Sequence, residues 1–272
     1  MTASSTSPFT LTQGTTPLLV SVPHAGTQIP DDLRYAFTDK ALQVPDTDWF
    51  LDKLYAFSKD LGASMMEPRY SRYVIDLNRP PDNQPMYAGS NNTELCPTRA
   101  FTGEPIYKDA PPDLAEIERR KALYWQPYHT ALQAELDRIK TIHGYALLWD
   151  GHSIKSTVPW LFEGRLPDLN MGTNNGASCA ASLQTMLDMA LQTLPHTQFS
   201  HVFNGRFKGG YITRTYGNPA QNIHAVQLEM CWSTYMQEHE PDPEHFELDT
   251  ARAVKLAPTL KALLTTMLTW KP

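Results

Sequence analysis

Residues 145–153 have the sequence YALLWDGHS, in which an apolar run passes directly into the polar residues Asp150 and His152. A short apolar run of this kind, bounded by a turn residue, is typical of a buried β-strand, which we expect at residues 145–150. The same pattern predicts strands at residues 17–23 (PLLVSVP), 72–77 (RYVIDL) and 225–230 (AVQLEM). Side chains that follow such strands lie at the carboxyl edge of the sheet, where α/β proteins bind their ligands.

Amphipathic segments between and after these strands predict helices. Apolar residues recur at helical spacing in residues 48–61, 111–142, 177–194 and 249–269. Pro127 is expected to kink or split the second of these helices. Residues 80–111 are rich in Pro, Asn, Gly and Thr, and a loop of this length is usually functional. Strands that alternate with helices indicate an α/β fold with helices on both faces of the sheet.

Composition restricts the classes of protein to which the chain can belong. It has 272 residues, of which 29 are acidic and 23 basic, so the formal net charge is −6. We therefore expect no nucleic-acid partner, because no basic run is present to neutralise phosphates. The length is sufficient for one large α/β domain or two small ones.

Cysteine usage and the N-terminal residues predict a cytoplasmic protein. The three cysteines, Cys96, Cys179 and Cys231, are widely spaced and form no CxxC motif, so we expect neither a disulfide framework nor a cysteine-rich zinc site. Residues 1–14 lack the basic and apolar regions of a signal peptide. No window approaches 18 uninterrupted apolar residues, so no membrane span is expected. The oligomeric state stays open.

The polar residues that follow or close the predicted strands suit a metal-dependent hydrolase. They are His24, Asn78, Arg79, Asp150, His152 and Glu229. Catalytic zinc uses about three protein ligands and an open position for water. His24 and His152 can supply two of the ligands, and a carboxylate should supply the third. Each histidine by itself could instead be a hydrogen-bonded turn residue.

Two acids near the start of the helix predicted at residues 48–61 are candidates for the third ligand. In the most familiar arrangement the carboxylate lies three residues after the first histidine, but that position is Thr27. We favour Asp48 as the ligand and keep Asp46 as the alternative. Asp46 then serves as a helix cap or as a partner of a metal-bound histidine.

Glu229 is the candidate general base. It lies inside the apolar run 225–230, and carboxylates are rarely buried without a partner. In this role it takes a proton from the attacking water and delivers it to the leaving amine. The alternative is a glutamate that faces solvent from an edge strand.

Several cationic side chains suit a small substrate with more than one carboxylate. Arg79, beside Asn78, can bind a carboxylate through two hydrogen bonds, and Arg72 and Arg214 are candidates for a second carboxylate. Each arginine could instead form an ordinary surface ion pair. Six further histidines are predicted to be surface residues, namely His129, His143, His196, His201, His239 and His245.

Taken in order, the motifs resemble the N-formylglutamate deformylase (N-formylglutamate amidohydrolase) family over about residues 17–236. They are VPHAGT at 22–27, DTDW at 46–49, YSR at 70–72, DLNRP at 76–80, DGHS at 150–153, FKGGYITR at 207–214 and QLE at 227–229. The DLNR run also resembles the substrate-carboxylate motif of aspartoacylase and the zinc carboxypeptidases. Thr27 departs from the pattern of that wider group, which has a glutamate there.

The resemblance implies a single amidohydrolase domain over residues 1–272. It implies a three-layer α/β/α fold with a mixed central sheet flanked by helices, as in zinc carboxypeptidases and aspartoacylase. The implied reaction is the zinc-dependent hydrolysis of N-formyl-L-glutamate to L-glutamate and formate in histidine degradation. Another divalent transition metal could replace Zn²⁺. The alternatives are a related zinc deacylase or carboxypeptidase acting on another N-acyl acidic amino acid, or a non-catalytic dicarboxylate-binding protein.

Overall fold

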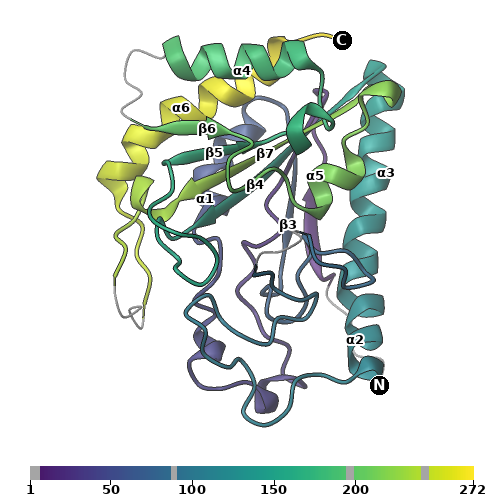
Figure 1. Cartoon of the computed structure of the whole chain (residues 1–272). Coiled ribbons are helices and arrows are strands. Elements are labelled where there is room, and N and C mark those ends of the chain that lie inside the picture. The colour runs from purple at the N-terminus through teal and green to yellow at the C-terminus, as the bar shows by residue number, and fades with distance from the viewer. Residues whose placement is uncertain (1–6, 87–90, 194–198, 240–244) are drawn as a thin grey trace.

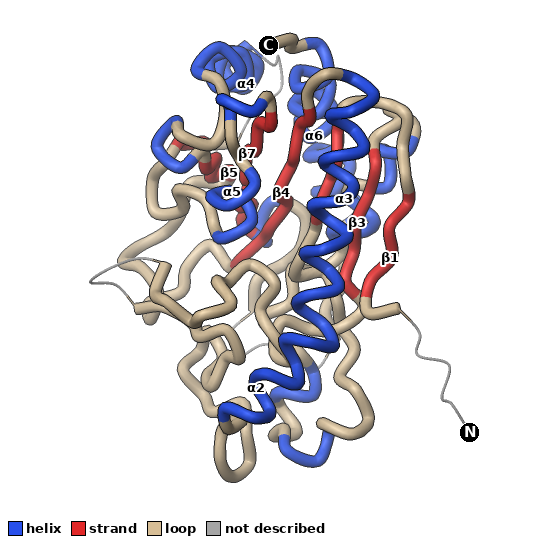
Figure 2. Tube along the Cα trace, turned by 90° about the vertical axis from the view of Figure 1, so that its right-hand side faces the viewer, coloured by secondary structure: helices blue, strands red, loops and turns tan. Residues whose placement is uncertain are grey.

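The computed structural model describes residues 7–86, 91–193, 199–239 and 245–272, which form a mixed β-sheet with helices on both faces (Figures 1 and 2). The strands lie in the order β1-β3-β2-β4-β7-β5-β6 across the sheet. The pairs β3–β2, β2–β4, β4–β7 and β5–β6 are parallel, whereas β1–β3 and β5–β7 are antiparallel. The strand bounds are β1 Phe9–Thr12, β2 Leu18–Ser21, β3 Ser64–Pro68, β4 Ala146–Ile154, β5 Leu169–Gly172, β6 His201–Phe203 and β7 Ile223–Cys231.

Helices cover the two faces of this sheet and confirm the predicted α/β/α layering. Helices α3 and α5 pack on one face, and α1, α4 and α6 pack on the other (Figure 2). Within the described residues, none of the helices has the length and apolar character needed to cross a membrane. The helix bounds are α1 Leu51–Leu54, α2 Leu114–Arg120, α3 Gln126–His143, α4 Ala181–Thr193, α5 Tyr211–Tyr216 and α6 Thr250–Thr269.

Strand β4 lies at the centre of the sheet and has no solvent-facing side, because all of its residues are buried. Leu147 and Trp149 belong to the apolar cluster that contains α4 and α6. Ala146 and Leu148 belong to the cluster that contains α3. This alternation follows from the two-residue period of a strand, and it makes β4 a firmly packed support for the polar residues at its carboxyl end.

The strand predicted at residues 72–77 is wrong. The chain forms turns there, and the strand in this part of the sheet is Ser64–Pro68. The amide of Val74 donates to the carbonyl of Ser71, which is a turn hydrogen bond and not a ladder contact. The segment resembles a strand in sequence because its apolar side chains are buried in two different clusters, which take up Tyr73, Val74, Ile75 and Leu77.

The helix predicted at residues 48–61 is mostly wrong. Helix α1 spans only Leu51–Leu54, and a separate 3₁₀ turn follows at Ala56–Lys59. Phe50 has φ 62°, in the left-handed region that a right-handed helix cannot contain. The helix therefore cannot reach back to Asp48, which lies in a loop.

The longest predicted helix, residues 111–142, is divided into α2 and α3. A π-helical turn at Lys121–Trp125 joins the two parts immediately before Pro127, the residue at which a break was expected. The predictions for residues 177–194 and 249–269 correspond to α4 and α6, and residue 194 lies outside the described residues. Strands β1, β5 and β6 and helix α5 were not predicted, because three to six residues carry too little periodicity.

Long connections gather beyond the carboxyl ends of β2 and β4 and form the loop-rich lower part of Figure 1. They have an apolar cluster of their own, which includes Phe37, Val74 and Ile106. The predicted loop 80–111 belongs to this region, and its residues 87–90 lie outside the described residues. These connections bring polar residues to the end of β4.

Candidate metal centre

The two central strands carry His152 and Glu229 to one place. His152 and Asp150 are two residues apart in β4 and therefore project from the same face. In the parallel register of β4 with β7, His152 lies opposite Glu229 and Asp150 lies opposite Gln227. Since β4 continues to Ile154, beyond the predicted end at residue 150, a strand and not a loop holds His152.

Two loops bring His24 and Asp48 together. His24 follows β2, and the backbone amide of Asp48 donates to the carbonyl of His24 at 3.1 Å. This hydrogen bond fixes the two backbones beside each other. Both side chains are buried, with exposed fractions of 3% for His24 and 1% for Asp48.

Three side-chain atoms converge at this point. The Nδ1 atoms of His24 and His152 are 3.1 Å apart, and Asp48 Oδ2 lies 3.1 Å from His152 Nδ1 and 3.6 Å from His24 Nδ1. Donors that share one tetrahedral zinc ion at 2.0–2.2 Å lie roughly 3–3.5 Å from one another. The three residues form a group that could hold a metal ion.

Carboxylates occupy the opposite nitrogen of each imidazole. His24 Nε2 lies 2.7 Å from Asp76 Oδ1, and His152 Nε2 lies 3.0 Å from Asp150 Oδ1. A carboxylate at Nε2 favours a proton on that nitrogen, which leaves Nδ1 with a free lone pair. The two Nδ1 atoms face each other at 3.1 Å, a distance at which they can share one proton or one metal cation.

The acid–base properties of the group agree with a cation site. Asp48 Oδ1 is buried and, among the described residues, has no hydrogen-bond partner. Burial alone would raise the pKa of Asp48, but its contacts with His152 and His24 hold the pKa below the ordinary value. Burial alone would lower the pKa of His152, but Asp150 and Asp48 raise it well above the ordinary value. The pocket therefore favours positive charge, and a metal would compete with a proton for His152.

Glu229 shares a small cavity with the two histidines. The cavity has a volume of about 50 Å³ and is lined by His24, His152 and Glu229, among others. Burial, with a contribution from Asp48, raises the pKa of Glu229 to about 8, although His152 opposes the shift. A carboxyl group whose pKa lies this close to neutrality suits proton transfer in both directions.

Two of the predicted arginines line the same cavity. Arg72 is buried, donates to Asp76 Oδ2 at 2.7 Å and lies 3.9 Å from Asp48 Oδ1. Arg79 donates to the backbone carbonyl and the hydroxyl of Thr93. Both guanidinium groups are thus held by protein contacts at the edge of the site.

Asn78 and Arg214 are placed differently. The Asn78 amide contacts His152 Nε2 at 3.0 Å and accepts from the backbone amide of Ile212, so it holds the histidine and the start of α5. Arg214 lies on α5, donates to the carbonyls of Gly209 and Met86, and is not among the residues that line the cavity.

Asp46 does not join the metal-binding group. Its Oδ2 accepts from the Tyr73 hydroxyl and from the backbone amide of Phe101, both at 2.8 Å. It is therefore a buried acceptor that ties two loops together beside the site.

Sequence reasoning missed the contact between Asp76 and His24. Asp76 accepts from Arg72 and from the backbone amide of Asn78 in addition to its contact with His24. The signal was present in the DLNR run, but the predicted strand at residues 72–77 would have extended this segment and separated these groups.

The prediction that His129 lies on the surface is wrong. His129 is buried between α3 and its neighbours, with Nε2 2.9 Å from the Leu77 carbonyl and Nδ1 2.8 Å from the Tyr216 hydroxyl. Of the other five histidines predicted at the surface, His239 and His245 are exposed, His143 and His201 are half-buried, and His196 lies outside the described residues.

Sequence comparisons with known proteins agree with one another on the family. The family model described as N-formylglutamate amidohydrolase matches residues 16–236. A curated N-formylglutamate deformylase from Pseudomonas putida is 51% identical over 253 residues, which cover 93% of this chain and 94% of the relative. A second, from Pseudomonas aeruginosa, is 46% identical over 259 residues and 95% of each chain.

Two solved structures share the fold. The crystal structure of N-formylglutamate amidohydrolase from Ralstonia eutropha JMP134 superposes with a TM-score of 0.80 at 22% identity, over 96% of this chain and 98% of the other. A gene product from Agrobacterium tumefaciens superposes with a TM-score of 0.72 at 15% identity, over 96% and 95% of the two chains. At these identities the likeness concerns the fold alone.

Proposed function

Because the chain belongs to the N-formylglutamate amidohydrolase family, we infer that it hydrolyses N-formylglutamate to glutamate and formate, and we propose that it does so with a divalent metal ion bound by His24, Asp48 and His152. Zinc is the first candidate, and other divalent transition metals also accept nitrogen and oxygen ligands. We place the reaction in histidine degradation in the cytoplasm.

The main support for the metal proposal is the convergence of three donor atoms, one from each of His24, Asp48 and His152. Both histidines turn Nδ1 toward Asp48 Oδ2, while carboxylates engage both Nε2 atoms. Asp48 Oδ1 is buried and, within the described residues, accepts no hydrogen bond, although Arg72 lies 3.9 Å from it. A buried carboxylate oxygen without a hydrogen bond can accept a metal ion as its partner.

The proposed chemistry assigns a role to each group in the cavity. A bound divalent ion supplies Lewis-acid polarisation of the formyl carbonyl and makes water nucleophilic near neutral pH. Glu229 accepts a proton from the attacking water and passes it to the amide nitrogen, so that the amine can leave. Burial raises the pKa of Glu229 to about 8, which makes its carboxylate a stronger acceptor for the proton of the attacking water.

Arg79 and Arg72 are proposed to bind the carboxylates of the glutamyl group. Both line the cavity, and a guanidinium group can bind a carboxylate through two hydrogen bonds. Asn78 supports the site by holding His152. Arg214 remains a candidate for the carboxylate farther from the reacting amide. A cavity of about 50 Å³ takes the reacting end of the substrate and not all of it.

The direct experiment measures formate release from N-formyl-L-glutamate before and after a chelator has removed bound metal. We expect activity to disappear with the metal and to return when Zn²⁺ or another divalent transition metal is added back. Unchanged turnover in protein shown by elemental analysis to be metal-free would refute the metal part and leave the family assignment intact.

A substrate panel tests the alternatives. A larger N-acyl group preferred over formyl would favour a related deacylase, and release of a C-terminal residue from a peptide would favour a carboxypeptidase. A dicarboxylate-binding protein would purify without stoichiometric metal and would bind glutamate without turning over any N-acyl derivative.

A further inference from the structure

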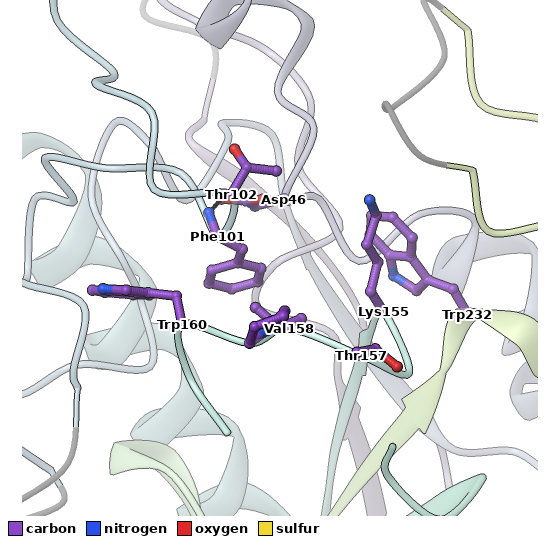
Figure 3. A pocket seen from close by; sticks show the side chains of 9 residues that line it. Asp46, Phe101, Thr102, Lys155, Thr157, Val158, Trp160 and Trp232 are labelled. Carbon is purple, nitrogen blue, oxygen red and sulfur yellow. Dashed lines mark hydrogen bonds between the residues drawn. The ribbon is translucent and has the colours of Figure 1, made fainter. Parts of the chain in front are cut away.

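A second, larger cavity adjoins the metal pocket. The metal pocket has a volume of about 50 Å³, and the outer cavity about 390 Å³. Phe101 lines both of them and is the one described residue that they share. Figure 3 shows its ring among the residues that line the outer cavity.

The two cavities differ in chemical character. The outer one is bounded largely by apolar and aromatic side chains, with Asp46 and Lys155 as its charged residues. The principal apolar walls are Phe101, Val158, Trp160 and Trp232. Asp46 and Lys155 carry opposite charges, so the lining residues of this cavity have no net positive charge. The cavity is therefore poorly suited to a dicarboxylate and well suited to an apolar chain.

Several contacts hold Phe101 in place. It lies in a tight turn in which the Gly103 amide donates to the Ala100 carbonyl at 2.8 Å. Its own backbone amide donates to Asp46. The Arg72 guanidinium lies over its ring, 4.9 Å from the ring centre. The ring is therefore fixed from the backbone and from its face, which suits it to act as a partition.

Phe101 also belongs to the apolar side of the metal pocket. Ile154, Leu161 and Phe207 also line this pocket and form one apolar cluster with Phe101, whereas Arg72 and Arg79 supply the cations. The carboxylates of the substrate require cations, so the uncharged formyl end is left for the apolar side.

We propose that Phe101 is the residue that restricts the acyl group to formyl, by closing the metal pocket toward the outer cavity. This inference rests on the proposed function. A chain of several methylene groups on the acyl carbon would need the space that the ring occupies. The reaction itself is unchanged for a longer acyl group: water adds to the carbonyl, the C–N bond breaks, and a carboxylate and glutamate are released.

The test compares the wild type with Phe101→Ala and Phe207→Ala on N-formyl-, N-acetyl-, N-butanoyl- and N-hexanoyl-L-glutamate. Glutamate release gives kcat/KM for each substrate. The measured quantity is the ratio of kcat/KM for the hexanoyl and formyl substrates, which does not depend on the fraction of active protein. Phe207→Ala is the matched control, because it removes the same atoms from the metal pocket at a residue that does not line the outer cavity.

We expect Phe101→Ala to raise this ratio by roughly tenfold or more over the wild type, since one methylene in an apolar pocket already changes discrimination by about 10–200-fold. Phe207→Ala should leave the ratio within about threefold of the wild type. Phe101→Leu, which keeps an apolar side chain of intermediate size, should raise the ratio by less than Phe101→Ala does. If Phe101→Ala does not fold, the comparison of Phe101→Leu with the wild type provides the test.

Three results would overturn the inference. They are an unchanged ratio in the Phe101 variants, an equal rise in Phe207→Ala, and a wild type that already accepts hexanoyl as well as formyl. By contrast, a wild type that releases no formate from N-formylglutamate would refute the proposed function itself, so the two failures are distinguishable.

Discussion

Replacing Glu229 by glutamine tests the proton-transfer role of a single side chain. Glutamine keeps the shape of the side chain but cannot accept a proton, so we expect kcat for N-formylglutamate to fall by roughly 10²–10⁴-fold. Metal content should not change, because Glu229 is not part of the group formed by His24, Asp48 and His152. Activity assays and elemental analysis on the same preparation check both points, and near-normal turnover would exclude Glu229 as the general base.

Replacing Asp76 by asparagine tests whether its contact with His24 strengthens metal binding. Asp76 holds His24 Nε2 at 2.7 Å, and loss of such a partner typically weakens metal binding by roughly 10–100-fold. We expect the variant to lose metal to a competing chelator at correspondingly lower chelator concentration. Excess metal should restore much of its activity.

The matched control for this prediction is Asp46→Asn. Asp46 is also a buried carboxylate, but it accepts hydrogen bonds from Tyr73 and from the backbone of Phe101 and is not part of the group formed by His24, Asp48 and His152. Its replacement should change metal affinity much less than Asp76→Asn does. Equal loss in both variants would mean that general disturbance of the loops, and not the contact with His24, weakens the site.

At the scale of single residues, the sequence identifies candidate functional residues better than it predicts which side chains contact each other. A carboxylate inside an apolar strand is unusual enough to single out Glu229 without a structure. The Asp76–His24 contact and the separate position of Asp46 depend on how two loops pack against each other. No periodicity in the sequence predicts the packing of loops. Asp46 and Asp48 look equivalent in the sequence because both lie before a segment that has helical spacing but forms only one short helix.

At the scale of elements, His129 links helix α3 to the loop that carries Asn78. Burial lowers the pKa of His129 from 6.5 to about 4. The unfolded chain therefore binds a proton at a higher pH than the folded chain does, so the stability from neutral His129 is present above pH 6.5 and is lost as the pH falls toward 4. We expect the wild type to lose about 2 kcal/mol more than His129→Gln between pH 7 and pH 5, measured by urea unfolding.

The control is His245→Gln, since His245 is exposed. The difference in unfolding free energy between this variant and the wild type should stay nearly constant over the same pH range. If His129→Gln also keeps a constant difference, the imidazole is not held neutral in the folded protein.

Elements with a clear period and sufficient length are predictable here, and short or aperiodic ones are not. Helix α6 matches its predicted bounds to within one residue, because its apolar stripe persists over twenty residues. The strand predicted at residues 72–77 is wrong because the side chains of this segment are buried in two apolar clusters, which gives the segment the composition of a buried strand. Strand β4 is longer than expected because Asp150 and His152 look like a strand end, yet both are buried partners inside the sheet.

At the scale of the whole molecule, the three-layer fold explains why distant segments meet. The parallel strands β2, β4 and β7 end at the same edge, so loops that follow β2 and side chains on β4 and β7 share one site. This much follows from the alternation of strands and helices, and the structure confirms it. Strand order and the antiparallel strands β1 and β5 do not follow, because they depend on long-range pairing that local sequence does not specify.

The proposed metal should stabilise the entire fold, because its ligands come from three segments that lie apart in the unfolded chain. A ligand present at 1,000 times its dissociation constant adds about 4 kcal/mol to the folded state. For a chain of this size, we expect chelation to lower the melting temperature by roughly 10 °C, measured by calorimetry with and without added Zn²⁺. His24→Ala should melt at nearly the same temperature in both conditions, because it lacks one of the three donors. An equal response to chelator in this variant and the wild type would locate the stabilising ion elsewhere, and no response in a wild type proven to have lost its metal would show that the fold does not depend on it.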